Sequence, residues 1–385
     1  MNASLDKKKI RDWLICAGLL AFVFVLIFVL EQILPRTSML FTVLKKGAIY
    51  ALVAVSMNLL NGFTGLFSLG QAGFMMIGAY TYAVFTIPVA LRPAVYQYFD
   101  GGAIQFAIPV FAALLLAGLA AAFFAFLIGL PVLHLKSDYL AIATLGFAEI
   151  MRALFQWDKL GVITNGSNLL RKYPVFRSTL FPVAVSGVCI ALIVLLINST
   201  YGRAFKAIRD DEVAAEATGI NLASHKRLSF TISSFFAGIS GALLAMFQTT
   251  IQANQFKSAM TYEILLIVVI GGIGSVTGSC ISSMLFVACS EWWLRFLDNN
   301  NLMIGSFHVP LLKPGFRKVV FAVVIMLIVI FWQRGIMGEN EFSIAGIKKA
   351  ARKLFARRAQ KAAAPKTLAS PKSGASSKAK NGGAK

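Results

Sequence analysis

Residues 201 to 220, YGRAFKAIRDDEVAAEATGI, carry seven charged side chains in a 385-residue chain that is 58% hydrophobic. The basic residues Arg203, Lys206 and Arg209 stand three apart, and the four acidic residues follow from Asp210 onward. Residues three apart in a helix lie on the same face. The chemistry that this segment offers is polar recognition of a partner by salt bridges and hydrogen bonds.

Two short helices are predicted here, the first from Gly202 to about Arg209. The second begins at Asp210 or Asp211, since either carboxylate can accept a main-chain N–H at the helix start. Glu212 complements the N-terminal dipole, and Gly219 is a natural C-terminal stop. Small side chains at Ala214, Ala215 and Ala217 allow close approach. We predict a docking surface, with a solvated connecting loop as the alternative.

The sequence contains no motif for covalent chemistry. The phosphate-binding pattern G-x-x-x-x-G-K-[ST] is absent, as are H-E-x-x-H and G-x-S-x-G. Four cysteines stand singly in apolar stretches and three histidines are scattered, so neither a disulfide framework nor a metal site is predicted. We therefore expect no enzyme and no cofactor, and energy for uphill transport would have to come from another protein.

Residues 61–83 form an apolar stretch unusually rich in small residues. Ser68 and Gln71, three apart, are predicted to share one helical face and to line a polar path. Glycine removes side-chain bulk where a neighbouring helix or a solute must come close. The glycines of this stretch are Gly62, Gly65, Gly70, Gly73 and Gly78. Plain helix packing is the alternative for these glycines.

A second glycine-rich run, VVIGGIGSVTGS at 268–279, holds Gly271, Gly272, Gly274 and Gly278 and predicts an unwound or tightly packed segment. We expect the translocation path to be lined by Ser68, Gln71, Gly73, Gly78, Gly271 and Gly272. Charged residues inside spans are costly and mark functional candidates. Glu149 and Arg152 lie three apart in one such span, and a structural ion pair is the preferred interpretation. TNGSN at 164–168 predicts a turn in an outer loop.

The elements that carry these residues are predicted to be transmembrane helices. Mean hydropathy is +0.74 and only 14% of residues are charged, which indicates an all-α, polytopic membrane protein. We expect about ten spans, including broken or re-entrant segments. They cover approximately 13–33, 39–60, 64–87, 104–130, 140–155, 181–198, 228–248, 262–271, 272–297 and 318–333.

Charge distribution predicts the orientation. The net charge of +21 is concentrated at the ends, and residues 334–385 carry thirteen Lys and Arg against two acids. Because cytoplasmic segments are rich in Lys and Arg, both termini and the loop 199–227 are expected in the cytoplasm. The domains are then a cytoplasmic N-terminus at 1–12, a transmembrane domain at 13–333 and a basic tail at 334–385 that is expected to be disordered towards its end. Aromatic residues for stacking on nucleic acid are nearly absent from the tail, so no nucleic-acid partner is expected.

Four ordered blocks carry a family resemblance: NLLNGFTGLFSLGQAGFMMIGAY, DYLAIATLGFAEIMR, GRAFKAIRDDEVAAEATGIN and EILLIVVIGGIGSVTG. Between about residue 40 and residue 297 the chain resembles the LivM-type permeases of branched-chain amino acid ABC transporters. The resemblance implies a bacterial inner-membrane permease that works by alternating access. Its implied partners are a second homologous permease, two ABC ATPase subunits and a periplasmic solute-binding protein. It makes the charged loop the ATPase-coupling element, with Arg203, Arg209, Asp211, Glu212, Ala215, Glu216 and Gly219.

The chain departs from the family pattern at three points. Gln71 stands where a His is common, Asn165 replaces a frequent Gly in the outer loop, and the long basic tail is an extra. Gln71 matters most, because it leaves the solute open. A permease for urea or short-chain amides is the alternative of the same fold. A secondary transporter or channel would require ion-coupling carboxylates within the spans, and few are present. A membrane scaffold would not explain the glycine-rich spans.

Overall fold

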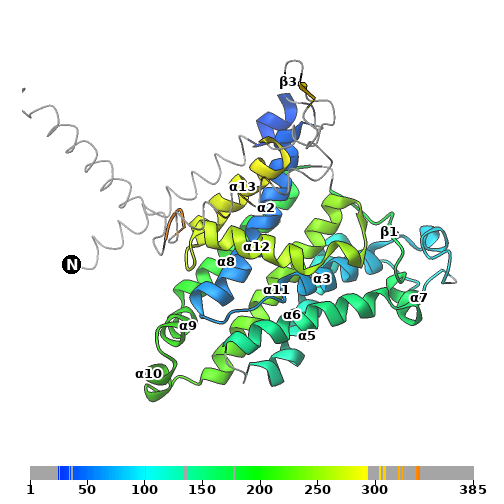
Figure 1. Ribbon diagram of the computed structural model, residues 1–385. Coiled ribbons are helices and arrows are strands. Elements are labelled where there is room, and N and C mark those ends of the chain that lie inside the picture. Colours follow the sequence, from blue (N-terminus) through cyan, green and yellow to red (C-terminus); the bar gives the residue numbers. More distant parts are fainter. Residues whose placement is uncertain are drawn as a thin grey trace, which may run out of the picture. The chain divides into compact units, whose positions relative to one another are not determined.

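The computed structural model describes residues 38–293 apart from 100, 134–136 and 177, with shorter pieces at 25, 27–33, 35, 303–304, 307–308, 320, 323, 326 and 335–338. All of these residues belong to one compact unit within residues 1–341. Helices dominate this part of the chain, and the prediction of an all-α, polytopic membrane protein is confirmed (Figure 1).

Four helices of the described residues are long and apolar enough to cross a membrane, and two bent helix pairs raise this number to six. The single spans are α2 with its extension (Met39–Phe63), α5 (Val110–Val132), α8 (Leu180–Asn198) and α11 (Leu222–Gln248). The bent pairs are α3 (Gln71–Thr86) with Val89–Val95, and α6 (Ser137–Gln156) with Asp158–Thr164. The predicted spans at 13–33 and 318–333 lie mostly outside the described residues.

The spans differ in how deeply they are buried. In α11, 78% of the apolar window is buried inside the protein, against 33% in α5 and 28% in α8. Many large apolar side chains of α5 and α8 are exposed, among them Phe111, Leu115, Leu119, Phe123, Leu192 and Leu195. Such surfaces suit lipid, so α5 and α8 lie at the periphery while α2, α3 and α11 form the centre.

The chain between α2 and α3 is not a continuous span. Helix α2 (Met39–Asn58) ends in a π-helical turn, η1 (Leu59–Phe63), and residues 65–70 have no regular structure before α3 begins at Gln71. The prediction of a helix from residue 64 was wrong at its start, because Gly65 adopts a left-handed φ of 77°. Ser68 therefore precedes the helix that Gln71 begins, and the two do not share a helical face.

A second interruption lies where it was predicted. Helix α12 (Ser258–Gly271) ends at the glycine pair, Gly272 has φ 112°, and α13 (Val276–Glu291) starts after Ser275. The turn at residues 335–338 binds the end of α12, because Ile336 N donates to Ile270 O at 2.8 Å. The first residues of the predicted tail are thus attached to this break.

Short elements gather at the end of the bundle where α3 and α6 finish. They are η2 (Val89–Leu91), α4 (Arg92–Val95), η3 (Asp158–Leu160), α7 (Gly161–Thr164) and η4 (Ala253–Gln255). Strand β1 (Leu170–Arg171) pairs antiparallel with β2 (Thr250–Ile251), and β3 (Met303–Ile304) with β4 (Phe307–His308). The predicted turn at 164–168 is confirmed by left-handed φ angles at Asn165 and Gly166.

Buried polar side chains stabilise this end. Arg92, 1% exposed, donates to Val84 O at 3.0 Å and Phe106 O at 2.7 Å, and also to Ile104 O. Tyr96 Oη donates to Ile163 O at 2.9 Å, and burial raises the pKa of Tyr96 to about 12. The phenol therefore remains a donor at neutral pH, and these bonds fix the short elements to one another.

Candidate functional site

The charged loop folds as two capped helices. In α9 (Thr200–Asp210), the buried residues Gly202, Phe205 and Ile208 stand three apart and form the inner face, while Arg203 is exposed. The cap of this helix is Ser199, whose hydroxyl accepts from Gly202 N at 3.5 Å. The apolar face packs α9 against the bundle, Arg203 lies on the exposed side, and Lys206 and Arg209 are half-buried between the two.

The second helix, α10 (Glu212–Ala217), begins at Asp211. Asp211 Oδ1 accepts from Val213 N at 2.9 Å and from Ala214 N at 3.1 Å. Of the two aspartates that the sequence offered as the cap, the structure therefore uses Asp211. Gly219 has φ 88°, and its N–H donates to Glu216 O at 2.9 Å. The predicted helix pair and its glycine stop are confirmed.

The outer side of α10 has a composition suited to contact with a protein. Val213 is 78% exposed, and Glu216 is exposed beside the small Ala214 and Ala217. Ala215 is only 3% exposed, so it packs α10 against the bundle and is not available at the surface. We name the exposed set Val213, Ala214, Glu216 and Ala217 the α10 surface.

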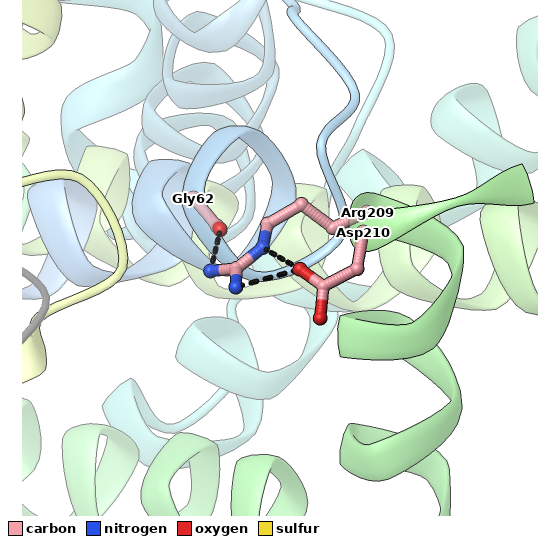
Figure 2. Close-up of polar contacts among 3 residues, drawn as sticks. All are labelled: Gly62, Arg209 and Asp210. Atoms are coloured by element: carbon pink, nitrogen blue, oxygen red, sulfur yellow. Dashed lines mark hydrogen bonds and ion pairs between the residues drawn. The ribbon is translucent and has the colours of Figure 1, made fainter.

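Three polar contacts hold the helix pair to the spans. Lys226 Nζ in α11 lies 2.6 Å from Glu212 Oε2. Arg209 Nη1 donates to Gly62 O in η1 at 3.2 Å, while its Nε and Nη2 bind Asp210 Oδ1 at 3.0 and 2.8 Å (Figure 2). Lys206 Nζ lies 5.5 Å from the ring centroid of Phe63 in the same π-helical turn. The loop is therefore attached directly to the end of α2.

Gln71 lies where α2, α3 and α11 meet, and it is 1% exposed. Its Nε2 donates to Ser56 Oγ at 3.0 Å and Ser233 Oγ at 3.2 Å, and Ser233 Oγ donates to Ser56 O at 2.6 Å. Ser68 is also buried, and its main-chain N–H donates to Asn61 Oδ1 at 3.2 Å. Gln71, Ser56 and Ser233 thus form a buried polar centre at the start of α3, next to the irregular backbone of residues 65–70.

The glycines of α3 lie in close helix contacts. A Cβ at Gly73 would approach Ala148 Cα in α6 to 2.9 Å, and one at Gly78 would approach Gly238 O in α11 to 2.0 Å. At the other break, a Cβ on Gly271 would meet the main chain of Gly278 at 2.6 Å. Close packing thus requires glycine at these positions, which favours the packing interpretation for them.

Asn58 is a site residue that sequence reasoning missed. It is fully buried at the last position of α2, and its side chain contacts the main chain of the α12–α13 break. Asn58 Oδ1 accepts from Gly274 N at 2.8 Å, and Nδ2 donates to Ser275 O and Ser279 Oγ, both at 2.9 Å. An amide that closes an apolar span, directly before a glycine-containing turn, was the available signal.

The intramembrane charges form the predicted ion pair. Arg152 Nη2 lies 2.7 Å from Glu149 Oε2, and Glu149 Oε1 also accepts from Ser258 Oγ at the start of α12. The carboxylate thus joins α6 to α12. No cluster of His, Cys, Asp or Glu that could hold a metal ion occurs among the described residues.

Comparison with known proteins identifies a family. A family model described as the permease component of a branched-chain amino acid transport system matches residues 39–344. The high-affinity branched-chain amino acid transport system permease protein LivM of Salmonella typhimurium is 33% identical over 295 residues, which cover 68% of this chain and 65% of the relative. LivM of Escherichia coli K12 is 32% identical over 297 residues, with the same coverage.

The chain thus spans 65% of the length of each of these two LivM proteins. A second permease protein of Escherichia coli K12, the high-affinity branched-chain amino acid transport system permease protein LivH, is 24% identical over 300 residues, 73% of this chain and 94% of the relative. No solved structure matches the chain significantly.

Proposed function

This chain belongs to the family of branched-chain amino acid transport permeases, and on that premise we propose that it is a membrane-spanning subunit of an ABC importer. It is a multi-pass membrane protein related to transport permeases, which are not enzymes. In the proposed mechanism, separate ATPase subunits close on ATP and push on α9 and α10. The spans then re-tilt and open the path to the other side of the membrane.

The observation that carries this proposal is the α10 surface. A helix of six residues that only joined two spans would have no need of an aspartate cap, a glycine stop and an exposed valine beside an exposed glutamate. Arg209 connects this helix pair to the broken end of α2, so a force on the loop reaches the spans. The chain has no ATP-binding motif of its own, and therefore another subunit would supply the energy.

The proposed location is the bacterial inner membrane with both termini in the cytoplasm. The loop 199–227 carries five Lys and Arg, and the chain ends are basic, as cytoplasmic segments are. The short elements around α7 would then face the periplasm, where a solute-binding protein would deliver the solute.

A second, related permease is proposed as the partner in the membrane. The support is that two different permease proteins of Escherichia coli, LivM and LivH, are both similar to this chain and bear the name of the same transport system. The chain is more similar to LivM, so a LivH-like subunit is the natural partner.

The proposed solutes are leucine and other branched-chain or hydrophobic amino acids. The chain itself specifies the solute weakly, because a binding protein would select it. Gln71, whose amide forms the buried polar centre, is the feature that keeps urea or short-chain amides as the second candidate.

Competition uptake in cells that lack their own branched-chain transporters tests the proposal. We expect unlabelled leucine to reduce labelled leucine uptake, while urea and short amides have no effect. Uptake of labelled urea or a labelled short amide, with no leucine uptake, would replace the amino acid assignment by the amide one. The absence of any ATPase subunit in the gently purified complex would instead favour a secondary transporter.

A further inference from the structure

The end of α2, the α12–α13 break and the loop helix α9 meet at one place. Arg209 of α9 donates to Gly62 O, and Gly62 lies against the side chain of Asn58 and the main chain of Gly274. A Cβ at Gly62 would come within 1.9 Å of Asn58 Oδ1 and 2.5 Å of Gly274 N. Nothing larger than hydrogen fits between them, so the three elements touch without a gap.

Asn58 binds two main-chain groups at the start of α13. The N–H of Gly274 lies in the break between the two helices, in the interior of a membrane protein where water cannot replace a lost bond. The carbonyl of Ser275 also accepts from Ser279 N at 3.2 Å, the first bond within α13. Asn58 binds both groups with one amide, at 2.9 and 2.8 Å, and its Nδ2 reaches Ser279 Oγ in the first turn of α13. The break is thereby held in one geometry relative to α2.

The location of Asn58 gives these bonds a mechanical consequence. It is the last residue of α2, directly before the π-helical turn whose Gly62 carbonyl accepts from Arg209. π-Helical turns are rare and are frequently found at functional sites. A displacement of α9 that moves Gly62 must therefore move Asn58 and, through its amide, the α12–α13 break.

We propose that Asn58 is a positioning residue that transmits movement of the α9–α10 helix pair to the α12–α13 break. This inference rests on the proposed function, since it takes ATPase subunits to be the source of the movement. Asn58 does not contact the solute in this account. It keeps two broken segments, the one after α2 and the one after α12, moving together.

The test uses the complete complex, purified with its ATPase subunits and placed in proteoliposomes with its solute-binding protein. The measured quantity is the number of leucine molecules imported per ATP hydrolysed, because a purely structural defect would lower both rates together. Asn58→Ala is expected to lower this ratio by at least about fivefold, the factor for one lost hydrogen bond of about 1 kcal/mol. ATP hydrolysis should continue, since the ATPase contact is on α10.

Two further variants make the test decisive. Ser279→Ala removes one of the Asn58 partners and is expected to lower the ratio by about twofold, because the bonds to Ser275 and Gly274 remain. Asn198→Ala is the matched control, since exposed Asn198 binds only within its own helix, to Val194 O at 2.9 Å. It should leave the ratio unchanged. If Asn58→Ala does not reach the membrane, Ser279→Ala carries the test.

The outcomes separate the two proposals. A wild-type ratio in Asn58→Ala or, where that variant is not inserted, in Ser279→Ala would overturn the role of Asn58 and leave the importer assignment standing. Equal losses of hydrolysis and uptake in these variants would also overturn it, in favour of a structural role. A wild-type complex that imports leucine without ATP would overturn the importer assignment itself, and the role of Asn58 with it.

Discussion

The guanidinium of Arg209 donates to the main-chain carbonyl of Gly62, 147 residues earlier in the chain, at 3.2 Å (Figure 2). The same side chain binds Asp210 through its other two nitrogens. One arginine thus attaches the last turn of the exposed loop helix α9 to the π-helical turn that ends α2. Through this contact the charged loop is coupled to the centre of the helix bundle.

Replacing Arg209 tests this contact. Arg209→Lys keeps the charge but loses the planar fork that reaches Asp210 and Gly62 at once. We expect leucine uptake to fall about fivefold at normal membrane levels, corresponding to about 1 kcal/mol. Arg171→Lys is the control, because Arg171 is an exposed residue of strand β1, and this variant should take up leucine normally. Wild-type uptake in Arg209→Lys would mean that the Gly62 contact is dispensable.

Charge reversal at Glu216 tests the α10 surface. Glu216→Lys changes an exposed side chain, so the protein should insert and melt as the wild type does. We expect it to retain far less ATPase subunit on an affinity column and to lose leucine uptake. Asp158→Lys makes the same change of charge near α7, far from α10 (Figure 1), and should retain the ATPase. Full ATPase retention by Glu216→Lys would remove the docking assignment of this residue.

Two glycine-to-alanine substitutions compare a glycine in a close helix contact with an exposed glycine. In Gly78→Ala the new Cβ would lie 2.0 Å from Gly238 O, a main-chain atom that cannot move aside cheaply. Overpacking of this kind costs about 1–3 kcal/mol or more, so a lower melting temperature in detergent is expected. Exposed Gly146 has no atom within 4 Å of an added Cβ, and Gly146→Ala should melt at or above the wild-type temperature. The reverse order would contradict the α3–α11 contact.

The basic tail offers a prediction outside the described residues. Its last residues, 360–385, are low in complexity and rich in Lys, Ala and Ser. The composition predicts that this segment has no fixed structure, and its deletion is therefore expected to leave leucine uptake unchanged. Uptake and membrane level of the truncated chain are to be compared with the full chain. Loss of uptake at an unchanged membrane level would assign the tail a role in transport.

Features with a local cause could be predicted from sequence, while features with a distant cause could not. The stop at Gly219 and the break after Gly271 depend on neighbouring residues and were predicted, as was a cap at Asp210 or Asp211, of which the structure has Asp211. The Asn58 amide binds Gly274, 216 residues away, and no local pattern indicates that pairing.

The start of α3 illustrates the same limit. The apolar, glycine-rich stretch from residue 64 has the composition of a helix, and only a left-handed Gly65 shows that the helix begins at Gln71. Similarly, Ala214, Ala215 and Ala217 look equivalent in sequence, yet Ala215 alone is buried. Which face of a short helix meets the bundle is decided by tertiary packing.

Import of leucine by the purified complex tests the central claim most directly. Proteoliposomes would contain the chain with its co-purified subunits, with the solute-binding protein outside and ATP inside. We predict that labelled leucine accumulates with ATP, and that no accumulation occurs with a non-hydrolysable analogue or without the ATPase subunits. Accumulation by this chain alone, driven by an ion gradient and indifferent to ATP, would contradict the account.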